Sequence, residues 1–262
     1  MSWGRILPVL FTLLLAVQGE PVLGARTKMI VRPAGDGVPA EAYGLCVPVR
    51  MSRDGVPVCS YDAQLPDGQW VGGLTAEALA AYGVNPLSDV LHPFAGRGLR
   101  LFLELCPPVG EMLSSERHAE RELILRRAED ASCALFLPAA DSLCGCVPMS
   151  EEALRTAYGA GFRPGEVWLI TGDATLCARF GGKSSKVPVC YISPDGMGAP
   201  GMRGSFLHRT QVTSKSDVKR LRRGGRRVVV WDVNSTEDAE ALRSYGVDFV
   251  LTDDPALIDS LK

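Results

Sequence analysis

The sequence lacks an excess of charge of either sign, since 28 Lys and Arg stand against 30 Asp and Glu, with a formal net charge of -2. This balance leaves long-range attraction weak and argues against nucleic acid as a partner. Internal repeats, low-complexity tracts and flexible linkers are also missing, which argues against a repeat array or two joined domains. With 262 residues, 46% of them hydrophobic, the chain can form one domain with a sizeable core.

Histidine is scarce, and the cysteine spacings typical of zinc sites are missing. The chain has three His (His92, His118 and His208) and eight Cys, with one CxC pair at Cys144 and Cys146 but no CxxC pair. A structural zinc site is therefore not indicated. Eight Cys fit an oxidising compartment, but they allow 105 complete pairings, so the sequence leaves the connectivity open. Several lie in apolar runs, where a buried thiol is the alternative.

One long apolar run, residues 6–17, lies near the start of the chain, after a short segment with one positive charge. Small residues then allow cleavage before Glu20 or Ala25. This order is typical of a secretory signal peptide, and the run is shorter than the roughly 20 residues that span a bilayer. We expect a signal peptide over 1–24 and a secreted or periplasmic domain over 25–262. An uncleaved anchor is the alternative.

Strand-like runs alternate with helix-like segments after this point. The runs are almost continuously apolar, as in parallel strands buried on both faces, and lie at 28–32, 45–49, 101–105, 133–137, 167–171, 187–192, 228–233 and 248–252. Amphipathic segments, several of which begin at a capping Ser such as Ser150, lie between them at 114–131, 150–160, 214–223 and 235–245. Eight such units in about 250 residues predict an α/β fold of the (β/α)8 TIM-barrel type. A doubly wound open sheet is the alternative.

Residues 50–68 interrupt this alternation after the second predicted strand. Asp54 and Gly55 supply a tight-turn pair within the segment. We therefore expect a short hairpin to extend from the barrel at this point.

Three blocks of the sequence carry recognisable motifs. They are VVVWDVNSTEDAEALRSYGVDFVLTDDP at 228–255, SRDGVPVCSYDAQL at 52–65, and 74–91 leading to LFLELC at 101–106. Together they resemble the glycerophosphodiester phosphodiesterase family, part of the phospholipase-C-like phosphodiesterase superfamily. The first block is similar to its last two strands, the second resembles its "T-K-D-G" segment, and the third follows in the same order. The resemblance implies a barrel in which carboxylates hold a divalent cation, two His act as acid and base, and an Arg and a Lys bind the phosphate.

Most of the residues that the family uses for this chemistry are replaced. The first strand keeps the Arg as Arg32, but Val31 stands where the resemblance places a His. Cys46 and Pro48 stand in place of the two metal carboxylates, and Tyr61 in place of the second His. The helix between the first two strands also has too few residues to form.

Two motifs are kept in part. The Glu-x-Lys of the third strand becomes Glu104-Leu105-Cys106, which keeps the Glu and loses the Lys. Trp231 and Asn234 match the family near the C-terminus. The resemblance then implies a substrate pocket lined by Arg32, Cys46, Pro48, Glu104, Cys106, Trp231 and Asn234.

One remaining carboxylate, Glu104, is a poor site for Ca²⁺ or Mg²⁺, which need several oxygen ligands. The resemblance therefore indicates a non-catalytic relative that needs no cofactor and binds a ligand or serves a structural role. The alternative is a divergent phosphodiesterase, using Ca²⁺ or Mg²⁺, that has rebuilt its site. Its candidate catalytic residues are Arg32, Glu104, Asp62, Tyr61 and His208.

The side chains at the predicted mouth leave several alternatives open. Glu104 is either a ligand or base, or the partner of Arg32 in an ion pair. Cys46 and Cys106 either form a disulfide, act as soft metal ligands with Glu104, or are two separate small apolar residues. Asp62 either takes part in chemistry or fixes the hairpin loop.

Basic residues gather between 219 and 227, namely Lys219, Arg220, Arg222, Arg223, Arg226 and Arg227. They could contact anionic lipid headgroups at about 1 kcal/mol each, or form a solvated helix end. The ligand class that the resemblance implies is a phosphodiester or a phospholipid headgroup. GGKSSK at 181–186 is not a phosphate loop, because Cys177 takes the place of its first Gly.

Overall fold

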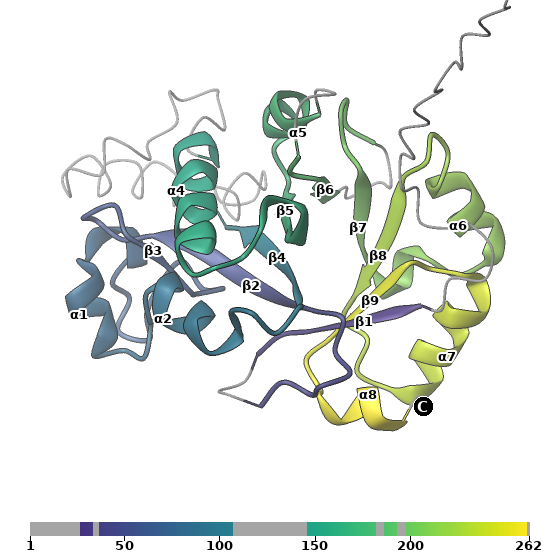
Figure 1. Cartoon of the computed structure of the whole chain (residues 1–262), viewed down its shortest axis with the longest axis horizontal. Helices are drawn as coiled ribbons and strands as arrows, with labels where there is room; N and C mark the ends of the chain where they lie inside the picture. The colour runs from purple at the N-terminus through teal and green to yellow at the C-terminus, as the bar shows by residue number, and fades with distance from the viewer. Residues whose placement is uncertain (1–26, 34–36, 107–145, 182–185, 193–197, 261–262) are drawn as a thin grey trace, which may run out of the picture.

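A closed barrel of eight parallel strands forms the centre of the chain (Figure 1). The computed structural model describes residues 27–33, 37–106, 146–181, 186–192 and 198–260. The strands are β1 (Lys28–Val31), β2 (Gly44–Met51), β4 (Arg100–Leu105), β5 (Val167–Thr171), β6 (Val189–Ile192), β7 (Gly204–His208), β8 (Arg227–Trp231) and β9 (Phe249–Thr252). Their order is β1-β9-β8-β7-β6-β5-β4-β2, and pairing of β1 with β2 closes the ring. The predicted TIM-type barrel is confirmed, and the open-sheet alternative is wrong.

One barrel strand, β7, was absent from the predicted set. Its sequence begins with Gly204 and Ser205, so its apolar run is too short to stand out. Gly204 is required there, because a Cβ would lie 2.8 Å from the Cys190 sulfur. The predicted strand 133–137 and helix 114–131 lie outside the described residues.

The predicted hairpin follows β2, whose end pairs in antiparallel fashion with β3 (Pro57–Val58). Gly55 adopts a φ of 79° at the turn, a conformation that suits glycine. The connection to β4 then contains η1 (Val71–Gly73), α1 (Ala76–Ala80), α2 (Leu87–Leu91) and η2 (His92–Phe94). The hairpin packs its own apolar cluster against this connection, which fixes it beside the barrel.

Helices cover the outside of the barrel (Figure 1). They are α4 (Cys146–Gly159), η5 (Pro164–Glu166), α5 (Ala174–Phe180), η6 (Arg209–Gln211), α6 (Lys215–Leu221), α7 (Thr236–Tyr245) and α8 (Ala256–Ser260). Ser214 and Ser235 cap α6 and α7 as expected. The expected start at Ser150 is wrong, because α4 begins four residues earlier and Ser150 is buried. Residues 37–43, which precede β2, form no helix.

The barrel interior is filled by alternate residues of the strands. Nine buried members of this cluster are Ile30, Cys46, Phe102, Ile170, Cys190, Phe206, Val229, Phe249 and Leu251. Since side chains alternate along a strand, the residues two positions further on point into the C-terminal mouth, the barrel end at which the parallel strands finish. No helix within the described residues is both long and apolar enough to span a membrane.

Candidate functional site

The register of the strands brings four of the predicted residues, Cys46, Pro48, Glu104 and Arg32, to or just below the C-terminal mouth. Cys46 pairs with Phe102, and Pro48 pairs with Glu104, across the β2–β4 ladder. Cys46 and Phe102 belong to the interior cluster, so Pro48 and Glu104 also face inward. Arg32 follows β1, and its backbone N–H donates to the Thr252 carbonyl at 3.1 Å.

Arg32 lies between two carboxylates from opposite sides of β1. Its Nη1 lies 2.8 Å from Asp253 Oδ1, and its Nη2 lies 3.7 Å from Glu104 Oε2. The Tyr61 ring covers the guanidinium, with 4.7 Å between the ring centre and Cζ. The Nε of Arg32 is buried without a hydrogen-bond partner in the described part of the chain. These contacts match the ion-pair alternative for Glu104.

Glu104 is largely buried, with 15% of its side chain exposed. Burial raises the pKa of its carboxyl group, while Arg32 and hydrogen bonds from Cys46 and Tyr61 act in the opposite direction. The Cys46 sulfur lies 3.8 Å from Glu104 Oε2. Burial and the neighbouring Glu104 raise the pKa of the Cys46 thiol, so this thiol serves as a weak donor and not as a nucleophilic thiolate.

Cys46 and Cys106 are both free thiols, so the disulfide alternative for this pair is wrong. Cys46 is turned toward the Glu104 carboxylate, whereas the Cys106 sulfur lies 3.5 Å from the Glu104 backbone carbonyl. The backbone carbonyl of Cys106 accepts a 3.0 Å hydrogen bond from Arg50 Nη1. These contacts hold the two sulfurs to different partners.

Arg50 was not among the predicted site residues, although it fixes the hairpin under the mouth. It is 3% exposed, and its guanidinium also donates to the Tyr61 carbonyl. By holding that carbonyl, Arg50 keeps the Tyr61 ring over Arg32. A charged residue inside the apolar run of β2 was the one sequence signal for this role.

Asn234 forms hydrogen bonds with Asp253, a residue that was also missing from the predicted site. The Asn234 side-chain oxygen accepts from the Asp253 N–H at 2.8 Å and from Thr252 Oγ1 at 3.1 Å. Its amide nitrogen donates to Asp253 Oδ2 at 3.2 Å. Asn234 therefore orients the carboxylate that binds Arg32.

His208 and Trp231 form a second group at the ends of β7 and β8. His208 Nε2 lies 2.9 Å from Asp232 Oδ2, and the Trp231 ring meets the imidazole edge-on at 4.6 Å. Asp232 has a φ of 64°, which is uncommon for a residue other than Gly. The bond to His208 and the Arg209 guanidinium lower the pKa of Asp232. Within the described residues, no hydrogen bond or ion pair joins this group to Arg32.

Asp62 is exposed in the hairpin loop, where its backbone carbonyl accepts from Ser60 Oγ at 2.9 Å. This hydrogen bond involves the Asp62 backbone alone, so the role of its side chain stays a prediction. The structure therefore brings Arg32, Glu104, Tyr61 and Cys46 together, and leaves Asp62 in the loop.

The side chains at the mouth do not fit the divalent cation that the family resemblance implies. The described residues contain no cluster of three or more His, Cys, Asp or Glu that could hold a metal ion. Glu104 is already paired with Arg32, and Cys46 and Pro48 supply no hard oxygen ligand beside it.

The fold is a (β/α)8 barrel with polar side chains gathered at the C-terminal ends of its strands. Proteins of this class carry their functional sites at that end of the barrel. Within that class, the chain belongs to the glycerophosphoryl diester phosphodiesterase family, whose profile matches residues 48–257. No curated protein matches the chain significantly.

Solved structures of the same class share the fold. An Oleispira antarctica phosphodiesterase in complex with the product sn-glycerol-3-phosphate is 15% identical to this chain, with a TM-score of 0.63. The alignment covers 90% of this chain and 96% of the Oleispira chain. A glycerophosphodiester phosphodiesterase from Parabacteroides distasonis is 21% identical to this chain, with a TM-score of 0.58. The alignment covers 90% of this chain and 97% of the Parabacteroides chain. At these identities the similarity establishes the fold alone.

Proposed function

We propose that this chain is an exported, non-catalytic member of its family, in which the old active-site mouth has become a structural ion-pair network. The observation that carries the proposal is the position of Arg32, which is bound by Glu104 on one side and Asp253 on the other. The family resemblance assigns this Arg to the phosphate of the substrate. Here two protein carboxylates take that place.

The charges at the mouth support the same conclusion. Arg32 contributes one positive charge, while Glu104 and Asp253 contribute two negative charges when ionised. Within the described residues, a phosphodiester at Arg32 would meet this group of three side chains with a net negative charge, and the nearby Arg50 is engaged with backbone carbonyls. A phosphodiester or phospholipid headgroup, the ligand class of the family, would bind at this mouth only after Arg32 is released.

A calcium titration followed by calorimetry tests the loss of the metal site. We expect no saturable binding of Ca²⁺ or Mg²⁺ by the mature chain, because Glu104 is its one inward carboxylate on β2 and β4. Glu104→Gln is the matched variant and should give the same flat titration. Saturable binding that disappears in Glu104→Gln would contradict the proposal.

A second candidate is a divergent phosphodiesterase with a rebuilt site, and the His208–Asp232 pair favours it. An imidazole held by a carboxylate at 2.9 Å is an arrangement suited to general acid–base catalysis. The left-handed backbone of Asp232 is also the kind of local strain that occurs at functional sites. Hydrolysis that is lost in His208→Asn while the variant stays folded would establish this candidate in place of the first.

Export is part of the proposal and rests on the apolar run at residues 6–17. Expression of the full-length chain in a secreting host should give an exported protein that begins at Glu20 or Ala25. N-terminal sequencing and intact mass measure this directly. A chain that keeps residues 1–24 and stays in the membrane fraction would instead support the uncleaved anchor.

A further inference from the structure

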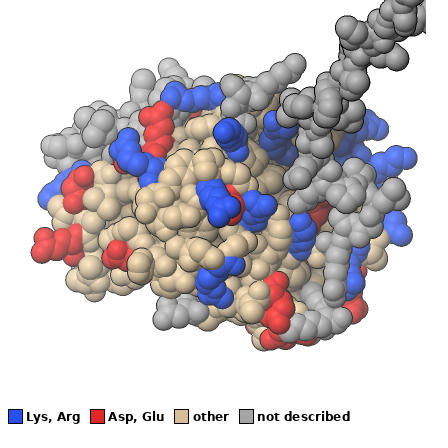
Figure 2. All heavy atoms as spheres, viewed as in Figure 1, with Lys and Arg blue, Asp and Glu red and all other residues tan. Residues whose placement is uncertain are grey.

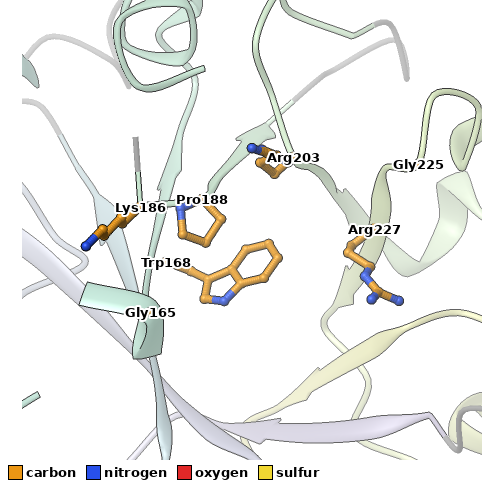
Figure 3. Close-up of a pocket in the computed structure, with 7 residues that line it drawn as sticks. All are labelled: Gly165, Trp168, Lys186, Pro188, Arg203, Gly225 and Arg227. Carbon is orange, nitrogen blue, oxygen red and sulfur yellow. The ribbon is translucent and has the colours of Figure 1, made fainter. Parts of the chain in front are cut away.

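A pocket of about 360 Å³ opens at the end of the barrel opposite the C-terminal mouth (Figure 3). Its lining residues precede or begin four successive strands, β5 to β8, and are Gly165, Trp168, Lys186, Pro188, Arg203, Gly225 and Arg227. The C-terminal mouth carries the active site in barrels of this class, so this N-terminal pocket lies outside it. Its volume falls in the range of small-molecule sites, about 300–1,000 Å³.

Among the described residues, three cations and no carboxylate line the N-terminal pocket. Lys186 and Arg203 are exposed, and neither forms an ion pair with another described residue. Arg227 lies 2.9 Å from Asp248, whose charge is shared with Arg222. The lining therefore keeps an unbalanced positive charge, which favours an anionic ligand.

The nearest acidic side chain along β5 is already engaged. Glu166 lies between Gly165 and Trp168 in sequence, and its Oε2 accepts from the Arg163 N–H at 2.9 Å. This bond uses Glu166 in capping the short η5 helix. The Glu166 carboxylate keeps its charge, but Glu166 is not among the residues that line the pocket.

Trp168 gives the pocket a rigid aromatic surface. Its ring stacks on Phe102 at 5.6 Å and meets Phe249 edge-on at 5.9 Å, so the barrel interior fixes its orientation. In Figure 3 the ring lies below Pro188 and Arg203, with Lys186 to its left and Arg227 to its right, and the charged ends of Lys186 and Arg227 point away from the ring. Such a surface suits the organic part of a ligand whose anionic group binds the cations.

The basic surface continues beyond the pocket. Gly224 and Gly225 form a turn with φ near 78° and 76°, and the sequence around them carries the cluster of basic residues between 219 and 227. Lys and Arg side chains are prominent over the centre and right of the face in Figure 2. The positive electrostatic potential of these side chains would raise the local concentration of an anion near the pocket.

We propose that the N-terminal pocket binds a phosphate monoester, with Arg203 contacting the phosphate, Lys186 and Arg227 adding positive charge from either side, and Trp168 against the organic group. Arg supplies a planar set of N–H donors that match phosphate oxygens, and Lys adds a point charge. The proposal is independent of whether the C-terminal mouth is catalytic, because no residue is shared between the two sites.

Titration of the mature chain with sn-glycerol 3-phosphate and with inorganic phosphate tests this site. Binding is followed by calorimetry and by the NMR signal of the Trp168 indole N–H, which Trp168→Phe identifies. We expect saturable binding that shifts this signal. Arg203→Glu should weaken binding by about tenfold or more, as for the loss of a charge-assisted contact, and Lys186→Glu should weaken it through the loss of nearby positive charge.

Two variants distinguish binding in the N-terminal pocket from attraction to the wider basic surface and from binding at the C-terminal mouth. Arg223→Glu makes the same change of charge outside the lining and should change the affinity by about twofold or less. Arg32→Gln alters the C-terminal mouth and should leave the Trp168 shift in place. Equal weakening in Arg223→Glu and Arg203→Glu, or loss of binding in an Arg32→Gln variant that stays folded by circular dichroism, would overturn the proposal.

Vesicles distinguish a lipid headgroup from a free ligand. Phosphatidylcholine vesicles with and without phosphatidate present the same monoester at a membrane surface. Binding of the phosphatidate vesicles alone, lost in Arg203→Glu, would place the phosphate on a lipid, and binding of glycerol 3-phosphate alone would make the ligand a soluble one. Absence of binding in both series, by a folded chain, would overturn the proposal.

Discussion

Asp248→Ala should lower the free energy of unfolding by about 2–4 kcal/mol, because it removes charge-assisted hydrogen bonds from two partly exposed Arg side chains and leaves a buried N–H without its acceptor. The Asp248 side chain is 4% exposed and lies 2.7 Å from Arg222 and 2.9 Å from Arg227. It also accepts from the Val228 N–H at 2.9 Å. The variant would leave two guanidinium groups and a buried N–H at the start of β8 without their acceptor. Chemical denaturation followed by circular dichroism measures the change.

The matched control is Glu152→Ala, because Glu152 forms an exposed ion pair with Arg155. Exposed pairs of this kind contribute about 0–1 kcal/mol. A loss in Asp248→Ala no larger than that in Glu152→Ala would show that Asp248 does not hold the β8–β9 region together.

Arg32→Met should lower the free energy of unfolding by about 2–4 kcal/mol at pH 8, because it leaves Glu104 buried without its cation. The Arg32 side chain is 20% exposed, so the expected loss is smaller than for a fully buried pair. Arg179→Met is the control, since Arg179 and Glu151 form an exposed pair and the expected loss is about 1 kcal/mol or less.

The cost of Arg32→Met should also depend on pH in a defined direction. Burial already raises the pKa of Glu104, and loss of Arg32 removes the group that lowers it most. Glu104 in the variant then binds a proton more readily when folded than when unfolded. The stability of the variant should therefore rise as pH falls through the raised pKa of Glu104, and its deficit against the wild type should shrink. A deficit that grows toward acid pH would contradict this role.

The barrel itself could be predicted from the sequence, because parallel strands buried on both faces leave continuous apolar runs. The capping positions Ser214 and Ser235 were equally visible. β7 was missed because Gly204, which the packing against Cys190 requires, shortens its apolar run. Such a requirement arises from contact between neighbouring strands and leaves no periodic signal.

Only part of the candidate site was predicted, because Asp253 and Arg50 were not among the predicted residues. The resemblance placed Arg32 and Glu104 at one end of the barrel, but Asp253 entered the site through an ion pair across 221 residues of sequence. Arg50 was missed for the same reason, since its acceptors are carbonyls of the hairpin and of Cys106. Local sequence cannot show which distant groups compensate a buried charge.

The most direct test of the central claim is hydrolysis of a panel of glycerophosphodiesters and lysophospholipids by the purified mature chain, with and without Ca²⁺, Mg²⁺ or Zn²⁺. The non-catalytic proposal predicts no turnover in any condition by a chain whose circular dichroism shows it to be folded. Glu104→Ala serves as the matched variant and should show the same absence of turnover as the wild type. Metal-dependent turnover that disappears in Glu104→Ala would contradict the proposal and would identify a rebuilt active site at the C-terminal mouth.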